Sequence, residues 1–418
     1  MKPALIDIQP RPCPICGSEN PHTVLNLPNT PLGDRFTTDP NTAKSLTSYP
    51  LEVDRCSSCG HCFVPYLMEP DESYQHYLFE SNQSPGLHRC FTEIVSDLCK
   101  RHSLTNYDLI LDIGANDGTW LSCFEAMGCD LIAVEPAPQP AEAATKRGIT
   151  VINDYFTENK IRSSGLIKKT PKLISMNYVF ANLPDPIQVL RDIASISDGD
   201  TVLSVLTGYH PAQLAVGMFD YVYHEHLSYY SCQDFLNLAQ SAGLIVSYCR
   251  EVPLKGGSLH LEMRKADSGI EQSTLFAMML KREAWLDQPR NIQWITMNEK
   301  LQQTRSLIQI AIERAKTQHR PIVGYGASHS TTTLIYSLGI ESFLDFVVDD
   351  NPAKQGRYSP GTAIPVHSPE HLSRQPEACV VILGWQHGPQ IIDALRRLGF
   401  SGLVVTPFPS FREERLSR

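Results

Sequence analysis

The chain has 418 residues, of which 42% are hydrophobic and 19% are charged. This length exceeds one ordinary domain and suits two or three domains with buried cores. The net charge of −9 argues against nucleic acid or an anionic membrane as a partner. No apolar run approaches the roughly 20 residues of a membrane helix, and residues 1–17 lack the apolar core of a signal peptide. We therefore expect a cytoplasmic protein with a small-molecule substrate.

Four of the twelve cysteines form two C-x2-C pairs, Cys13–Cys16 and Cys56–Cys59, and a glycine follows each pair. Two such knuckles supply the four thiolates that tetrahedral Zn²⁺ prefers. Because four thiolates close the coordination shell, we predict a structural zinc with no catalytic role. Four incidental cysteines or a redox pair are the alternatives. A redox role is disfavoured because neither pair follows a strand and opens a helix.

Beyond residue 85 the apolar pattern is that of an α/β protein. Apolar positions from Leu87 to Leu98 recur on one face of a helix expected over residues 86–102. Between residues 107 and 265, short apolar runs alternate with helical stretches, which predicts a parallel sheet covered by helices. Residues 269–318 are predicted to be mostly helical, with a break at Pro289. A second α/β cycle begins near residue 320.

Residues 109–118, LILDIGANDG, predict a strand, a glycine turn and a helix that begins near Thr119. Gly114 would let a ligand approach the backbone, and Asp112 could hold an ammonium group. The next strand ends in Glu135, about 20 residues on, where a carboxylate can bind two ribose hydroxyls. This pattern serves NAD or S-adenosylmethionine (SAM). The turn lacks the G-x-G-x-x-G that a pyrophosphate needs, so SAM is preferred over NAD and over a fold without a cofactor.

The SAM prediction extends to other polar positions in the same order. Asn116 lies in the glycine turn, and Asp154 and Phe156 follow the third strand, where they would meet the edge and face of adenine. Asn177 follows the fourth strand and would lie beside the methionine moiety. These residues complete the predicted cofactor site.

Residues 221–226 contain five potential proton-transfer groups, namely Tyr221, Tyr223, His224, Glu225 and His226. A structural region seldom concentrates so many, because each buried polar group needs a partner. A solvated aromatic loop is the alternative. The position of this segment after the methyl-donor region favours a catalytic role.

Together these motifs resemble the SAM-dependent sugar C-methyltransferases that act on nucleotide-linked 4-keto-6-deoxy sugars. The similarity covers nearly the whole chain and keeps the family's order: the two zinc knuckles, LDIGANDG, FDYVYHEHLSYYS, KGGSLHLEM, VGYGAS and VVDDNPAKQGRYSPG. The resemblance implies a three-part α/β enzyme, with the sugar nucleotide in a cleft between the parts. These parts are a zinc-binding domain (1–70), a class I SAM methyltransferase domain with a Rossmann-like fold (71–268) and a C-terminal Rossmann-like substrate-binding domain (320–418). The predicted helical stretch, residues 269–319, would connect the last two.

The chemistry that the resemblance implies is methylation of a carbon next to a ketone through an enolate. His226 would be the general base, and Glu225 would orient or polarise the neighbouring histidines, including His224. Tyr223 would donate to the enolate oxygen as charge develops. Tyr77 falls where the family carries an active-site tyrosine.

Two further motifs are expected to contact the acceptor. Lys255, Gly257 and Ser258 offer a cation and exposed amides to phosphate oxygens, although a plain hairpin turn would also explain them. Tyr325 lies in the glycine turn of the last α/β cycle. Asn351 ends the next strand, at the edge where ligands bind in open α/β sheets. A tight turn is the alternative there.

The chain departs from the family pattern at three places, which leaves the acceptor open. Asn182 stands where the family commonly has histidine. His329 follows the glycine turn of the last α/β cycle, where the family usually has lysine. Lys255 and His260 are basic residues in swapped order, because the family usually has histidine first and arginine second. An NAD-dependent sugar-nucleotide oxidoreductase or epimerase is an alternative, but its Tyr-x-x-x-Lys pair or phosphate-binding glycine finger is not found. A non-sugar, oxygen or nitrogen acceptor and a non-catalytic binding protein are the others.

Overall fold

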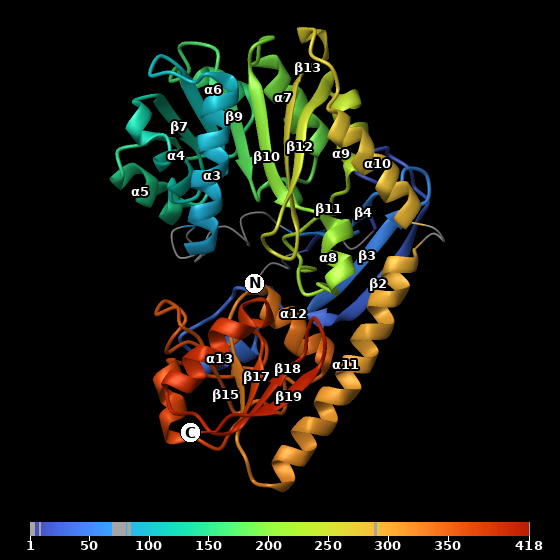
Figure 1. Cartoon of the computed structure of the whole chain (residues 1–418), viewed down its shortest axis with the longest axis vertical. Coiled ribbons are helices and arrows are strands. Elements are labelled where there is room, and N and C mark those ends of the chain that lie inside the picture. The colour runs from blue at the N-terminus through green and yellow to red at the C-terminus, as the bar shows by residue number, and fades with distance from the viewer. Residues whose placement is uncertain (1–4, 8–9, 69–80, 82–84, 288–290, 418) are drawn as a thin grey trace. The chain divides into compact units, whose positions relative to one another are not determined.

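The structure is a computed structural model of the chain that describes residues 5–7, 10–68, 81, 85–287 and 291–417 (Figure 1). It divides into two compact units. The first comprises Met1–His22, Asp54–Ala212 and Leu227–Gln288, and the second comprises Thr23–Val53, Gln213–His226 and Pro289–Arg418. This division does not test the four predicted domain ranges, which stay a prediction.

A seven-stranded sheet in the order β12-β13-β10-β9-β6-β7-β8 forms the centre of the first unit. Five of its strands are parallel: β6 (Leu109–Ile113), β7 (Asp130–Val134), β8 (Thr150–Ile152), β9 (Leu173–Asn177) and β10 (Val202–Gly208). The remaining two, β12 (Leu244–Val252) and β13 (Ser258–Lys265), are antiparallel. The predicted parallel sheet is therefore confirmed for five strands. The last two form a hairpin because the turn 253–257 is too short for a parallel crossover.

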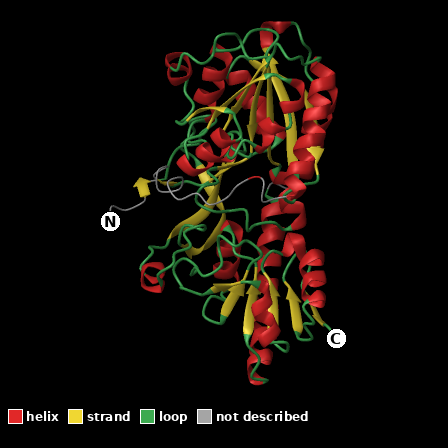
Figure 2. Ribbon diagram, turned by 90° about the vertical axis from the view of Figure 1, so that its left-hand side faces the viewer, coloured by secondary structure: helices red, strands yellow, loops and turns green. Residues whose placement is uncertain are grey.

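Helices cover both faces of this sheet (Figure 2). The alternation of β6 shows why: Leu109, Leu111 and Ile113 join one hydrophobic core, and Ile110 joins the other. The first core also contains residues of α6 (Glu158–Ser163), α7 (Pro186–Ser195), α9 (Cys232–Ser241) and α10 (Thr274–Leu286). The second contains residues of α3 (Pro85–His102) and α4 (Thr119–Ser122). The helices predicted over 86–102 and from Thr119 are confirmed. The further helix of this unit is α5 (Pro138–Lys146).

The described strands of the N-terminal region form two small sheets. A four-stranded sheet has the order β11-β4-β3-β2 and consists of β2 (Pro21–Thr30), β3 (Tyr49–Cys56), β4 (Cys62–Phe63) and β11 (Ser228–Tyr229). The two remaining strands, β1 (Leu5–Asp7) and β5 (Leu67–Met68), pair with each other, and α1 spans Pro40–Lys44. Only short strands are expected in this region from its Pro, Asn and Thr content. That expectation is wrong for β2 and β3, which have 10 and 8 residues.

The second unit contains the predicted second α/β cycle. Its sheet has the order β16-β15-β14-β17-β18-β19, with β14 (Ile322–Tyr325), β15 (Phe346–Val348), β16 (Val366–His367), β17 (Cys379–Ile382) and β18 (Leu403–Thr406) parallel and β19 (Arg412–Arg415) antiparallel. Besides α1, the α-helices among its described residues include α11 (Ile292–Thr317), α12 (His329–Leu338) and α13 (Gly388–Arg397). The chain passes between the units within α8 (His210–Val216). The α/β fold class is confirmed.

Two long helices account for the predicted helical stretch. The α10 and α11 helices lie on either side of residues 288–290, so the helical prediction for 269–318 is confirmed, and Pro289 itself lies outside the described residues. Across the part of the chain that the structure describes, no helix is both long and apolar enough to cross a membrane.

Candidate functional site

The four predicted zinc ligands lie together in the first unit. The Sγ atoms of Cys13, Cys16, Cys56 and Cys59 are all within 4.8 Å of one another. Cys13 and Cys59 are 3.6 Å apart between their Sγ atoms, and Cys16 and Cys56 are 3.5 Å apart. A tetrahedral zinc with Zn–S bonds of about 2.3 Å places sulfur atoms about 3.8 Å apart. The four thiols therefore fit a zinc ion.

Each cysteine pair closes its own tight turn. The Gly17 amide donates to the Cys13 carbonyl and the Gly60 amide to the Cys56 carbonyl, both at 2.9 Å. Both glycines have positive φ angles, +69° and +84°, a conformation that residues with a Cβ rarely adopt. The glycine after each C-x2-C pair is thus a requirement of the knuckle.

We predict one zinc per chain. Replacing one ligand, as in Cys56→Ser, is expected to abolish stoichiometric zinc and destabilise the first unit, because three thiolates no longer close the shell. Metal content by mass spectrometry of the purified protein measures this. The control is Cys62→Ala, a buried cysteine outside the cluster. A full zinc equivalent in Cys56→Ser would refute the four-thiolate site.

The predicted SAM residues gather at the carboxyl edge of the parallel strands. Asp112 is 2% exposed, and its Oδ1 accepts a hydrogen bond from the Ser175 hydroxyl at 2.7 Å. Burial raises the pKa of Asp112 to about 8, and the nearby Glu135 contributes. The Oδ1 atom of Asn177 is buried and has no hydrogen-bond partner among the described residues. An acceptor oxygen and a buried carboxyl with no cation beside it in the described part of the chain both suit the ammonium group of SAM.

Glu135 lies at the end of β7 and is 6% exposed. Its Oε2 accepts the amide N–H of Asn116 and its Oε1 accepts the amide N–H of Ala137, both at 2.8 Å. Burial raises its pKa. A carboxylate has about four lone-pair positions, so both oxygens can still accept from ribose hydroxyls while the two amides hold the side chain in place.

The other cofactor candidates are engaged by the protein itself. The Asn116 side chain accepts the amide N–H of Ser81 at 3.0 Å. Asp154 forms an ion pair with Lys160, which lowers its pKa, on a surface where both side chains are more than 40% exposed. Phe156 packs against the core of the first unit. Their assignments to the cofactor stay predictions.

Gly114 is required by packing within the protein. Its φ angle is +71°, and a Cβ atom at this position would lie 2.3 Å from Cγ2 of Val179. The amide of Gly114 donates to the Val134 carbonyl at 2.8 Å, which ties the turn to β7. The glycine thus lets the turn after β6 pack directly against the segment after β9.

We predict that Gly114→Ala weakens SAM binding at least tenfold, because the added methyl displaces the turn or Val179. Calorimetric titration of SAM measures this. Gly165→Ala is the matched control, since Gly165 has a similar φ of +64° but nothing within 4 Å of an added Cβ. Equal SAM affinity of wild type and Gly114→Ala would contradict the prediction.

The segment with five proton-transfer groups lies in the second unit, where side chains from two elements hold it. The Thr333 hydroxyl, on α12, donates to the Val222 carbonyl at 2.8 Å. The Trp385 indole N–H, after β17, donates to Oδ2 of Asp220 at 2.9 Å. Asp220 is 1% exposed, and burial raises its pKa to about 7. The backbone of the segment is thereby fixed on two sides.

Hydrogen bonds define the tautomer of His226. Its Nδ1 is 2.9 Å from the Tyr221 carbonyl, which can only accept, so Nδ1 carries the proton. Its Nε2 is 2.6 Å from the Tyr223 hydroxyl. In the neutral imidazole, Nε2 is therefore the basic nitrogen, and it accepts the hydrogen bond of this phenol.

A chain of ionisable side chains lies beside this pair. Lys354 donates to Oδ1 of Asp34, and Nδ1 of His329 is 3.8 Å from the same oxygen. On its other side, Nε2 of His329 is 3.9 Å from Oε1 of Glu225. The ring centroids of His329 and Tyr223 are 5.3 Å apart. Burial alone would raise the pKa of Asp34, but the neighbouring cations outweigh it and hold that pKa below its usual range.

His224 has a different environment from the other groups of the segment. It is 2% exposed, and its Nε2–H donates to the Pro50 carbonyl at 3.2 Å. Burial lowers its pKa. This geometry suits a residue that holds the segment in place. Tyr77, the remaining catalytic candidate, lies outside the described residues.

The predicted acceptor motif of the last α/β cycle has its turn amides satisfied internally. The Asp349 carboxylate accepts the amide N–H of Ala327 at 2.6 Å and that of Asn351 at 2.7 Å. Tyr325 donates its hydroxyl to Asp350. The Asn351 side chain accepts the amide N–H of Ala353, which is the geometry of a tight turn. The acceptor roles of Tyr325 and Asn351 stay predictions.

In the first unit, Lys255 lies in the turn between β12 and β13, with its Nζ 3.7 Å from the Tyr178 ring centroid. His260 is fully buried in β13 and bonds the Ser204 hydroxyl at 3.0 Å, so it is part of the sheet interior. The sequence analysis did not identify Tyr178, which contacts Lys255, or Asp34, which bonds Lys354.

The Gly-Asp pair at residues 33–34, which forms a turn, is the sequence feature that could have pointed to Asp34.

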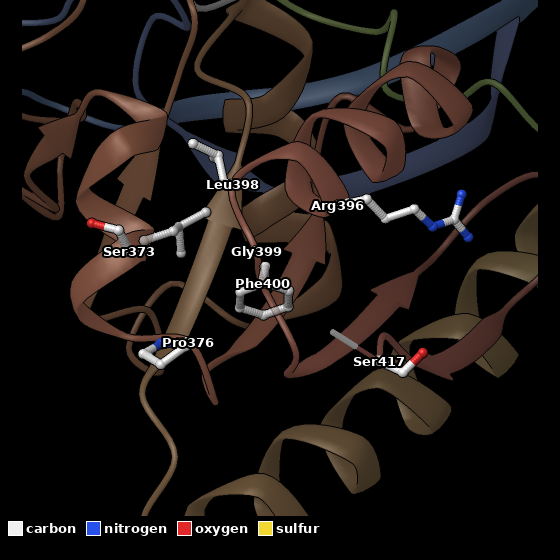
Figure 3. Close-up of a pocket in the computed structure, with 8 residues that line it drawn as sticks. Ser373, Pro376, Arg396, Leu398, Gly399, Phe400 and Ser417 are labelled. Atoms are coloured by element: carbon white, nitrogen blue, oxygen red, sulfur yellow. The ribbon is translucent and has the colours of Figure 1, made fainter.

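A surface cavity of about 350 Å³ lies in the second unit (Figure 3). It is lined by Leu372, Ser373, Pro376, Arg396, Leu398, Gly399, Phe400 and Ser417. None of the predicted site residues that the structure describes is among them. This cavity is separate from the candidate site.

Comparison with known proteins shows what the chain resembles. Family models match the chain in sequence order: a zinc binding domain at residues 13–74, a methyltransferase domain at 74–247 and a C-methyltransferase C-terminal domain at 253–409. The C-methyltransferase NovU of Streptomyces niveus is 27% identical over 403 residues, 96% of each chain. The chain is a SAM-dependent methyltransferase. Its cofactors are SAM and zinc, and the NAD-dependent alternative is set aside.

Solved structures resemble part of the methyltransferase. A SAM-dependent methyltransferase from Clostridium acetobutylicum is 12% identical and covers 43% of this chain and 92% of its own, with a TM-score of 0.35. One from Aquifex aeolicus is 17% identical and covers 44% and 98%, with a TM-score of 0.33. Likenesses this weak carry no argument about the site.

Proposed function

We propose that the methyltransferase transfers the methyl group of SAM to the carbon next to the ketone of a nucleotide-linked 4-keto deoxysugar. The observation that carries this proposal is the His226 tautomer, with a basic Nε2 paired to the Tyr223 phenol. A base and a hydroxyl donor side by side are the two groups that enolate formation needs. The relationship to the C-methyltransferase NovU supports a carbon acceptor.

The proposed chemistry uses these residues in two roles. The Nε2 atom of His226 takes the proton from the carbon next to the ketone, while the Tyr221 carbonyl keeps the ring oriented through Nδ1–H. Tyr223 turns its O–H from His226 to the ketone oxygen, on which negative charge develops. SAM, when bound, supplies the electrophilic methyl group. The deprotonated carbon forms the new bond as the sulfur–methyl bond breaks, and the proton leaves His226 for solvent.

Glu225 and His224 have supporting roles in this proposal. Glu225 is 10% exposed, and one of its oxygens is buried without a hydrogen-bond partner among the described residues. As a carboxylate in the same segment, Glu225 would stabilise the imidazolium that His226 becomes. His224 holds the segment to the start of β3 through the Pro50 carbonyl. We also propose the four domain ranges given above and a cytoplasmic location.

The sugar nucleotide is the finer part of the proposal. Nucleoside diphosphate 4-keto-6-deoxyhexoses are the acceptors to test, with detection of a product heavier by one methylene. Methylated product from such an acceptor supports the proposal. SAM binding without methylation of any keto sugar nucleotide would favour a non-sugar, oxygen or nitrogen acceptor.

We predict that His226→Ala lowers kcat by about 10²–10⁴-fold, because it removes the general base. SAM affinity by calorimetry should be nearly unchanged, since the predicted SAM residues all lie in the first unit. Exchange of the acceptor's C–H with deuterated solvent should fall with kcat. His371→Ala, in the second unit and outside the proposed site, is the control. A near-normal rate for His226→Ala would overturn the base assignment.

A further inference from the structure

Two bulky residues with left-handed backbone conformations touch each other in the first unit. Tyr178 has a φ of +57° and Lys255 a φ of +50°. The Lys255 Nζ lies 3.7 Å from the centroid of the Tyr178 ring, which is cation–π geometry. Residues other than glycine hold such angles only where the surrounding structure imposes them, and they cluster at functional sites.

The pair lies at the edge of the sheet that holds the predicted SAM residues. Tyr178 directly follows Asn177 at the end of β9. On the neighbouring strand, Gly208 ends β10 opposite Ser258, the first residue of β13. Because β9 and β10 are parallel, their carboxyl ends meet at one edge, and the turn that carries Lys255 projects from it. Lys255 therefore belongs to the unit that would hold the methyl donor.

Two hydrogen bonds and a close contact fix Lys255 in this place. The Ser258 hydroxyl donates to the Leu254 carbonyl at 2.9 Å. The Tyr178 hydroxyl is 2.9 Å from the same Ser258 oxygen and so must be the donor of that bond. Gly257, with a φ of +124°, packs so closely that a Cβ would lie 2.5 Å from Cβ of Ala212. The Tyr178 ring is thereby held beneath the ammonium.

Burial lowers the pKa of Lys255 to about 8, from an ordinary value of 10.5. Burial is the cause of this shift, and among the described residues Tyr178, on the segment after β9, is a titratable group that faces the amine. A donor with a pKa near the working pH is well matched to an oxygen whose charge grows during reaction. It is poorly matched to a permanent phosphate charge, which favours a fully protonated lysine.

We propose that Lys255 is a catalytic residue whose ammonium donates a hydrogen bond to the acceptor's carbonyl oxygen as negative charge develops there, and that Tyr178 positions it. This inference rests on the proposed function. The acceptor's proton goes to the general base, and Lys255 keeps its own proton throughout, so it returns to its starting state after each turnover. The acceptor class this requires has a carbonyl oxygen next to the methylated carbon.

The first experiment compares Lys255→Gln and Lys255→Arg with wild type on a nucleoside diphosphate 4-keto-6-deoxyhexose. Loss of one donor to the developing charge should lower kcat of Lys255→Gln about a hundredfold, with the KM of SAM and acceptor little changed. Wild-type kcat should fall as pH rises through about 8, where the ammonium loses its proton. In Lys255→Arg the fall of kcat should begin at a higher pH, because the guanidinium stays protonated.

Lys172→Gln is the matched control. Lys172 lies before the amino end of β9, at the opposite edge from Tyr178, and its Nζ is 3.9 Å from a carboxylate oxygen of Asp200. The kcat and the pH profile of Lys172→Gln should equal those of wild type. For Tyr178, the Phe variant keeps the ring and should retain most activity, whereas the Leu variant should lose it in parallel with Lys255→Gln.

The second experiment needs no acceptor. Reductive methylation with ¹³C-formaldehyde labels the lysines of the whole protein, and Lys255→Gln identifies the Lys255 signal in the NMR spectrum. Its titration midpoint should lie near pH 8, and Tyr178→Leu should lower it, because the ring stabilises the ammonium. A midpoint near the ordinary 10.5 would overturn the inference whatever the activity.

The outcomes separate this inference from the proposed function. If wild type methylates the keto sugar nucleotide but Lys255→Gln keeps its kcat, the inference is wrong and the proposed function stands. A rise in acceptor KM alone would assign Lys255 to phosphate binding and would also overturn it. If wild type methylates no keto acceptor, the proposed function fails and the inference fails with it.

Discussion

The parallel register of β6, β9 and β10 is the constraint on which the first unit depends. Parallel strands present their carboxyl ends at one edge, so the residues that end them meet there although they are far apart in sequence. Asp112 and Asn177 come together in this way, and Asp112 pairs across the sheet with Ser175, which bonds its carboxylate. The antiparallel hairpin of β12 and β13 brings Lys255 to the same edge.

Burial at this edge shifts the pKa values of two ionisable side chains in opposite directions. Asp112 and Lys255 have ordinary pKa values at opposite ends of the scale, yet burial brings both to about 8. The carboxyl rises and the amine falls because a low-dielectric site disfavours either charged form. Groups in this state respond strongly to a bound charge, which is the behaviour that the proposed site for a charged methyl donor and a developing oxyanion would use.

The second unit fixes a short segment that contains many polar groups. Side chains of α12 and of the loop after β17 bond the backbone and the Asp220 carboxylate of this segment. These bonds leave His226 with one defined tautomer, because the carbonyl of Tyr221 can only accept. Asp34 contributes from a loop that precedes the segment by almost two hundred positions in the printed sequence. It pairs with Lys354 and lies 3.8 Å from Nδ1 of His329.

The sequence by itself determined the features that depend on local spacing. The C-x2-C-G knuckles, the strand–turn–helix of LDIGANDG, the helix over residues 85–102 and the α/β order of the chain follow from short-range backbone geometry and apolar periodicity. The family resemblance added the expected chemistry. Tertiary structure decided what depends on contacts between distant residues: the antiparallel direction of β12 and β13, the partner of Lys255, the neighbours of His329 and the tautomer of His226. Burial, charge and hydrogen-bond direction arise only when separate segments pack together, and no local spacing encodes them.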